Sequence, residues 1–333
     1  MSYALSIAVG SRGGRDRDAT FDDIRAAEDG GVDTAWVAES WGEDAFTLMT
    51  QMVDRTKRMK VGSGIVNVYS RTPAALAQHF GTLDVVSGGR VIIGLGTSGA
   101  NVIEEFHGLP FDKPLQRLRE YVDILNILMS GEPLQYEGEI FQFSRGFTLR
   151  FDRERDHIPI YLATLAPKSV RMTAELADGW LPIWTPIEKL PEVAGQIASQ
   201  SVAAGRPSDA VTIRSPGGVV FTQDVEGARA RVAGNFAFYI SRMGVFYHRH
   251  LTRLDYGEVA DAIRGAWDEG GSKAGAAAVP PELQQSLTLV TDSVEAARER
   301  FAAEEAAGVR LHSVTVDVES PHEAEKIYAA LAG

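Results

Sequence analysis

The 333-residue sequence contains no cysteine. Disulfides, thiolate nucleophiles, iron–sulfur clusters and cysteine-ligated zinc are therefore excluded. Any redox activity must then depend on a bound organic cofactor or on a metal held by other side chains. The sequence also has no run of 18 apolar residues, and its first ten residues show no basic leader or cleavage site. We therefore expect a cytoplasmic protein without a membrane partner.

Positive charge is scarce as well, because 33 lysines and arginines are outnumbered by 45 aspartates and glutamates, which gives a net charge of -12. Such a surface repels phosphate backbones and argues against a nucleic-acid partner. A helix N-terminus or a local group of backbone N–H donors can still bind a phosphate-bearing small molecule. The expected partner is therefore a small-molecule substrate.

Short apolar runs alternate with amphipathic runs along the chain. The expected strands are residues 4–9, 34–38, 60–66, 90–95, 158–163, 179–183, 211–221 and 312–318, and the expected helices are 21–30, 44–55, 73–87, 115–130, 167–176, 187–204 and a segment from 225 onward. Strands that are apolar on both faces and followed by helices predict an α/β fold, the (β/α)8 TIM barrel with insertions after several strands. An open doubly wound sheet is the alternative.

Residues 1–333 are expected to form one domain, because α/β barrels routinely reach this length. Two insertions are predicted, at about 134–150 and at 232–281, the first resembling a hairpin. Residues 270–278 are rich in glycine and alanine and resemble a flexible connector. Insertions after strands are where barrel enzymes build lids.

Reacting groups of barrel enzymes lie where strands end. The second expected strand is followed by Glu39 and Trp41, a carboxylate that can bind a proton or hydroxyl and an indole that can stack on a planar ring. The alternative is that Trp41 packs a loop and that Glu43 and Asp44 favour the start of the next helix. A catalytic role is preferred for Glu39 and Trp41 and the helix start for the other two.

Glycines interrupt the third and fourth strands, in residues 62–67 and 94–101. Glycine inside a strand marks a bulge or a close backbone approach. A flat ring against the backbone explains this pattern, and a bulge caused by packing explains it equally well. The second run matches neither the Walker loop nor the dinucleotide fingerprint, but its hydroxyl residues offer donors to a polar ligand.

The fifth strand leads into a helix that carries Lys168 and Ser169 near its start. These side chains and the free N–H groups of the first turn predict a phosphate site, and a capped helix with an exposed lysine is the alternative. His107 is typical of a loop residue. A basic cluster at residues 242–253 has no assigned role, and no metal-ligand spacing is evident, so no metal is expected.

Several segments together resemble a known family. Residues 62–65, 94–99, 106–111, 114–115, 119–121, 159–163, 177–180 and 305–308 are similar to the luciferase-like flavin and deazaflavin oxidoreductases. The run 94–99 with His107 and Gly108 resembles the branch that uses the deazaflavin coenzyme F420, the methylene-tetrahydromethanopterin reductase-like proteins. The resemblance spans nearly the whole chain and implies a luciferase-like TIM barrel and a homodimer, with the helix at 73–86 as a candidate interface.

The resemblance also implies a site. A cis peptide at Ser63–Gly64 or Gly64–Ile65 would support the central deazaflavin ring. The residues that would contact the cofactor are Ser63, Gly64, Ile65, Asn67, Thr97, Ser98 and Asn101 around the ring, and Ala163, Thr164, Leu165, Lys168 and Ser169 at its phosphate-bearing tail. The implied reaction is hydride transfer between C5 of F420 and a small organic substrate, with Glu39 near the ring and Trp41 as a substrate wall.

The chain departs from two groups of this family. Its first strand reads Ser6-Ile7-Ala8-Val9, where the methylene-tetrahydromethanopterin reductases carry an acidic residue. After the second strand it has Glu39-Ser40-Trp41 in place of the differently spaced His and Trp of the sugar-phosphate and alcohol dehydrogenases. These particular substrates are therefore not expected. An FMN-dependent monooxygenase and a non-catalytic deazaflavin-binding protein are the alternative functions.

Overall fold

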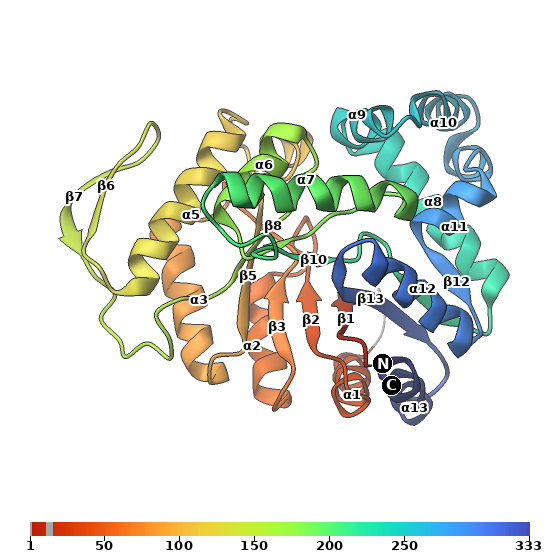
Figure 1. The fold of residues 1–333 in the computed structure, drawn as a ribbon, viewed down its shortest axis with the longest axis horizontal. Coiled ribbons are helices and arrows are strands. Elements are labelled where there is room, and N and C mark those ends of the chain that lie inside the picture. The colour runs from red at the N-terminus through yellow and green to blue at the C-terminus, as the bar shows by residue number, and fades with distance from the viewer. Residues whose placement is uncertain (1, 11–15) are drawn as a thin grey trace.

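The computed structural model describes residues 2–10 and 16–333. Eight parallel strands form a closed ring, and their order is β1 (Leu5–Val9), β2 (Thr34–Val37), β3 (Lys60–Ser63), β5 (Val91–Gly96), β8 (Ile160–Leu162), β9 (Gly179–Trp180), β10 (Thr212–Arg214) and β13 (Val309–Asp317). Most of these strands can be followed in Figure 1, with helices around them. The ring closes because β13 pairs with β1, where Leu5 lies opposite His312 and Ser6 opposite Ser313. The predicted TIM barrel is confirmed.

The seventh strand differs from its prediction. Residues 211–221 form two strands, β10 and β11 (Val219–Thr222), with Pro216, Gly217 and Gly218 between them. Proline donates no backbone hydrogen bond, and Gly218 has a φ of +76°, with a position for a Cβ only 2.0 Å from the Ser313 carbonyl oxygen. Beyond this break, β11 pairs with β13 on one edge and with β12 (Leu289–Thr291) on the other, a strand that the sequence did not predict.

The helices cover the outside of the ring and build the insertions. Their bounds are α1 (Arg17–Asp29), α2 (Ala45–Arg55), α3 (Pro73–Ser87), α4 (Ala100–Glu105), α5 (Pro114–Ser130), α6 (Pro167–Leu176), a 3-10 turn η1 (Ile187–Lys189), α7 (Leu190–Ala203), α8 (Val225–Arg242), α9 (Val245–Arg253), α10 (Gly257–Ala277), α11 (Pro281–Leu287), α12 (Val294–Ala306) and α13 (Pro321–Ala332). No helix in the described part is long and apolar enough to cross a membrane.

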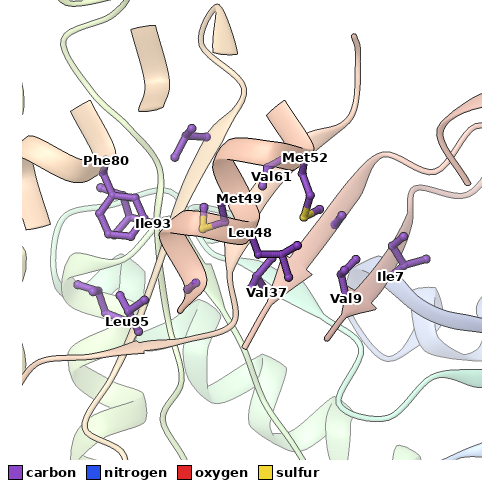
Figure 2. Packing of buried hydrophobic residues seen from close by; sticks show 14 of the residues in the cluster. Ile7, Val9, Val37, Leu48, Met49, Met52, Val61, Phe80, Ile93 and Leu95 are labelled. Carbon is purple, nitrogen blue, oxygen red and sulfur yellow. The ribbon is translucent and has the colours of Figure 1, made fainter. Parts of the chain in front are cut away.

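The main core lies between the outer faces of the strands and the surrounding helices. Figure 2 shows strand residues meeting residues of α2 and α3, and it labels Ile7, Val9, Val37, Leu48, Met49, Met52, Val61, Phe80, Ile93 and Leu95. All of these side chains are buried. Burying each of them contributes about 1.5–3 kcal/mol to folding. Because successive side chains of a strand point to opposite faces, their neighbours along each strand face the barrel interior.

The two segments predicted as insertions form a hairpin and a group of helices. The hairpin of β6 (Leu134–Glu137) and β7 (Gln142–Phe147) projects away from the barrel, and α8, α9 and α10 lie toward the opposite side of the molecule (Figure 1). Glu120 of α5 anchors the hairpin, because its carboxylate accepts hydrogen bonds from the backbone N–H groups of residues 139–141. The predicted connector at 270–278 was wrong. Most of it belongs to α10, which is interrupted at Gly271, where φ is +71°.

Candidate active site at the mouth of the barrel

Small side chains line the inside of the barrel near the carboxyl ends of its strands. Ile7 and Val9 pack outward in the core, so Ala8 faces inward between them, and it is solvent-exposed although it lies on a strand. Ile65 and Ala163 are half-buried at the same end. The barrel is therefore open at its C-terminal face, where the enzymes of this architecture hold their ligands.

The third strand carries the backbone feature that the family resemblance implied. The Gly64–Ile65 peptide bond is cis, and it lies between β3 and the two-residue strand β4 (Val66–Asn67). Of the two bonds predicted, this is the second. The Gly64 N–H donates to the Val37 carbonyl over 2.7 Å, and the Glu39 N–H donates to the Ile65 carbonyl over 3.1 Å. The bulge is thus tied to the end of β2.

Packing inside the barrel explains two of the glycines. A Cβ on Gly62 would lie 2.5 Å from the ring of Trp36, and one on Gly94 would lie 1.6 Å from the Ser63 carbonyl oxygen. Gly96 is different, because its Cβ would meet only the side chains of Ile65 at 3.1 Å and Ala163 at 3.5 Å. The absence of a side chain at Gly96 therefore lets Ile65 and Ala163 approach the end of β5, and Gly96 itself is buried.

Polar residues predicted on the third strand are already engaged. The fully buried Ser63 hydroxyl donates to the Gly94 carbonyl over 2.8 Å and accepts from the Gly94 N–H over 2.9 Å. The Asn67 amide oxygen accepts from the N–H groups of Tyr69 and Ser70, while its nitrogen lies 3.4 Å from Nε2 of His107. Both side chains shape the rim, and Asn67 also brings an imidazole to it.

The fourth-strand run forms an accessible edge. Thr97 and Ser98 are half-buried, and Ser98 has a φ of +57°, which turns the backbone away from the strand. The Thr97 hydroxyl donates to the Ser98 carbonyl over 3.1 Å. Asn101 is exposed in the first turn of α4. The structure therefore presents these three residues together just beyond β5.

Glu39 is held in an ion pair. Its carboxylate receives two hydrogen bonds from the Arg71 guanidinium, at 2.6 and 3.0 Å, and a third from the Ala45 N–H at the start of α2, at 2.9 Å. Only 10% of the Glu39 side chain is exposed. The hydrogen bond with Glu39 is the main reason that the pKa of Arg71 is raised. Arg71 also pairs with Asp44. Asp44 is the N-cap of α2, in agreement with the helix-start role predicted for it.

Aromatic residues surround the same face. Trp41, in the loop after β2, is 52% exposed. The rings of Tyr69 and Phe111 stack with centroids 5.5 Å apart, and Phe111 meets Phe246 of α9 edge-on at 6.2 Å. This row connects the loop after β4 with the late insertion, so apolar surface is available to cover a bound ring.

The predicted phosphate site at the start of α6 includes Lys168, which has no acidic partner among the described residues. The Thr164 hydroxyl lies 2.7 Å from that of Thr173, and the Ser169 hydroxyl closes the helix start by bonding to Ala166. Lys168 is exposed. The Arg253 guanidinium of α9 donates to the Leu165 carbonyl over 3.4 Å, which brings a second positive charge to this place.

The basic cluster at 242–253 separates into members with different surroundings. His250 is buried, and this burial lowers its pKa to about 4, with its Nε2 3.1 Å from the Thr185 hydroxyl. His248 pairs with Asp261. Arg253 is the member that reaches the end of a barrel strand. No local pattern in the sequence predicts this contact, because it joins residues 88 positions apart.

The chain is similar to known proteins over most of its length. A model of the luciferase-like monooxygenase family matches residues 3–311. The chain belongs to this family. It is 34% identical, over 88% of its own length and 89% of the other, to a Mycobacterium tuberculosis protein named as a coenzyme F420-dependent oxidoreductase. It is also 33% identical, over 74% of each chain, to a 5,10-methylenetetrahydromethanopterin reductase of Archaeoglobus fulgidus.

A solved structure shares the fold over almost the whole chain. The coenzyme F420-dependent tetrahydromethanopterin reductase of Methanopyrus kandleri superposes with a TM-score of 0.79, covers 98% of this chain and 97% of its own, and is 20% identical. At this identity the likeness concerns the fold alone. Together with the sequence relatives, it makes this luciferase-like protein an oxidoreductase built on a TIM barrel.

Proposed function

We propose that this oxidoreductase binds coenzyme F420 and transfers a hydride between C5 of the deazaflavin and a small organic substrate. The observation that carries the proposal is the 34% identity, over most of both chains, to a relative named as F420-dependent. When bound, F420 supplies the carbon that accepts or donates the hydride. The protein supplies orientation and proton handling.

The mouth of the barrel fits a flat ring with a phosphate-bearing tail. Ala8 and Ala163 project no more than a methyl group into the accessible space. Backbone and hydroxyl groups of Thr97 and Ser98 edge this space. Lys168 at the start of α6 offers an ammonium group and a helix N-terminus to a phosphate. We therefore assign the ring to the mouth and the tail to the start of α6.

The polar side chains at the rim have separate tasks in this proposal. Glu39 positions the loop that carries Trp41, since its carboxylate joins Arg71 to the first turn of α2. His107 is the group placed to hold or release a proton, at Nδ1, because its Nε2 accepts from the Asn67 amide nitrogen, which orients the ring. Trp41 and Phe246 are exposed apolar surfaces that can exclude water from the bound substrate.

Equilibrium titration with F420 and, in parallel, with FMN tests the cofactor. We expect micromolar or tighter binding of F420, followed by a change in its visible absorbance or fluorescence, and little binding of FMN. Preference for FMN would instead support the oxygen-dependent monooxygenase alternative. Binding of F420 without turnover across a substrate screen would support the carrier alternative.

Two glycine-to-valine variants distinguish a local effect on cofactor binding from a general effect on the fold. Gly96→Val displaces Ile65 and Ala163 at the mouth, because even a Cβ there would lie 3.1 Å from Ile65 and 3.5 Å from Ala163, and we expect F420 binding to fall by at least tenfold. Gly195→Val is the matched control, since nothing lies within 4 Å of a Cβ at that position on α7. Equal F420 affinity in the two variants would exclude the mouth as the ring site.

A further inference from the structure

Arg214 is a cation inside the barrel. It ends β10, and because its neighbour Ile213 packs outward with Val170 and Ile197, Arg214 points inward. Its Nε donates to the Ser6 hydroxyl over 3.3 Å, and its guanidinium carbon lies 5.8 Å from the centre of the Trp36 ring.

No carboxylate in the described residues lies within ion-pairing distance of Arg214. The terminal nitrogens of its guanidinium have no acceptor in this part of the chain, and they are not among its fully buried unpaired atoms. They therefore reach accessible space. The Trp36 indole N–H is also without an acceptor there, and the Ser6 hydroxyl donates its hydrogen to the His312 carbonyl. Arg214 and Trp36 therefore both offer N–H donors inside the barrel.

Small residues lie between Arg214 and the mouth on the β1 side. Ser6 lies beside Arg214, and the next inward residue along β1 toward the mouth is Ala8, which is exposed among the described residues. Opposite them, Ala163 follows β8 and is half-buried. A molecule that enters the mouth can thus extend an acceptor group down to the guanidinium.

The energetics argue against a purely structural role. Burial lowers the pKa of Arg214 to about 10, and the charge of Glu304 offsets this only in part, so the group is still a cation at neutral pH. An enclosed charge without an opposite charge is costly, and an apolar side chain would fill the same place at lower cost. A ligand carrying the missing negative charge would account for an arginine at this position.

We propose that Arg214 determines substrate specificity by binding a carboxylate, so that the molecules taken up beneath the mouth are small organic acids. The fork of N–H donors in a guanidinium matches the two oxygens of a carboxylate. The inference rests on the proposed function only in that this acid is the substrate of the hydride transfer. Binding of the acid at Arg214 is a separate property that the apoprotein must also show.

Calorimetric titrations of the purified apoprotein test the proposal. The probes are propionate, butyrate and benzoate, each compared with its neutral amide of nearly the same shape. We expect wild-type protein to bind at least one acid more than tenfold tighter than its amide. Arg214→Gln should bring this ratio close to one, and Arg214→Lys should retain part of it. Arg145→Gln, at an exposed arginine of β7, should leave the ratio unchanged.

The outcomes separate this proposal from the proposed function. Unchanged preference in Arg214→Gln, or no preference for any acid in the wild type, overturns the carboxylate site. Weaker F420 binding in Arg214→Gln with unchanged acid preference would identify Arg214 as a cofactor contact and also overturn it. Acid preference that depends on Arg214 in a protein that binds no F420 would support the site while refuting the proposed function. If Arg214→Gln does not fold, as judged by circular dichroism, the fall in ratio in Arg214→Lys decides.

Discussion

Replacing Glu39 by glutamine tests whether this residue acts in catalysis or in positioning. The substitution keeps the shape of the side chain and removes its charge, so the paired hydrogen bonds with Arg71 are weakened and the N–H of Ala45 competes for one remaining acceptor. Hydrogen bonds to charged groups contribute about 1.5–3 kcal/mol. Because Arg71 keeps its second partner, Asp44, we expect Glu39→Gln to lower the free energy of unfolding by about 2 kcal/mol.

Glu43→Gln is the matched control in the same loop. Glu43 pairs with Arg17, but this pair is exposed, with 46% of the arginine side chain and 35% of the glutamate accessible. Exposed ion pairs contribute about 0–1 kcal/mol. Urea denaturation should therefore distinguish the two variants, and a double-mutant cycle of Glu39→Gln with Arg71→Gln should give a coupling energy of about 1–2 kcal/mol.

Kinetics under F420-dependent turnover complete this test. If Glu39 positions the rim, Glu39→Gln should lower the stability of the protein. Saturating F420, by stabilising the folded variant, should then restore most of the wild-type kcat. A variant as stable as the wild type whose kcat falls by about a hundredfold, the scale of a lost general acid or base, would refute the positioning role and make Glu39 a catalytic residue, as the family resemblance implied.

Three further predictions follow from the surroundings of single residues. The folded-state pKa of His250 is lowered to about 4, below the unfolded value near 6.5. The free energy of unfolding should therefore fall as the pH falls from about 6.5 toward 4. Urea midpoints measured against pH should show less of this loss in His250→Gln than in the exposed control His322→Gln. Glu120→Ala should speed hydrogen exchange in the hairpin, measured by mass spectrometry, and unchanged protection there would contradict the anchor. Gly94→Ala should prevent stable folding, because its Cβ would overlap a carbonyl oxygen, whereas Gly195→Ala, in open space on a helix, should raise the unfolding free energy by about 0.5–1 kcal/mol, as thermal melts would show.

The barrel was predictable because its signal is local. Strands buried on both faces read as continuous apolar runs, and several helices begin at a residue with a recognisable role, as Pro73 and Pro167 illustrate. The break inside residues 211–221 was missed, since the apolar character continues on both sides of the proline and glycines. The connector prediction at 270–278 failed because alanines favour a helix and Gly275 packs closely against Trp267.

The candidate site was predictable by position but not by the state of its side chains. The rule that ligands bind where barrel strands end selects the rim around Thr97 and Lys168. It cannot show that the hydroxyl of Ser63 is consumed by Gly94, because that bond depends on the register between β3 and β5. Nor can it show that Glu39 is paired with Arg71, which lies 32 residues further along the chain.

The net charge of the chain does not indicate the charge at the mouth of the barrel. The chain carries a net charge of -12, yet within the described residues the mouth has cations without acidic partners at two depths: Arg214 inside the barrel, and Lys168 with Arg253 at the start of α6. Arg71, by contrast, is neutralised by its carboxylate partners. An acidic surface around an uncompensated positive interior directs anionic groups inward once they pass the rim. The distribution of paired and unpaired arginines, rather than the total charge, therefore determines what this barrel can bind.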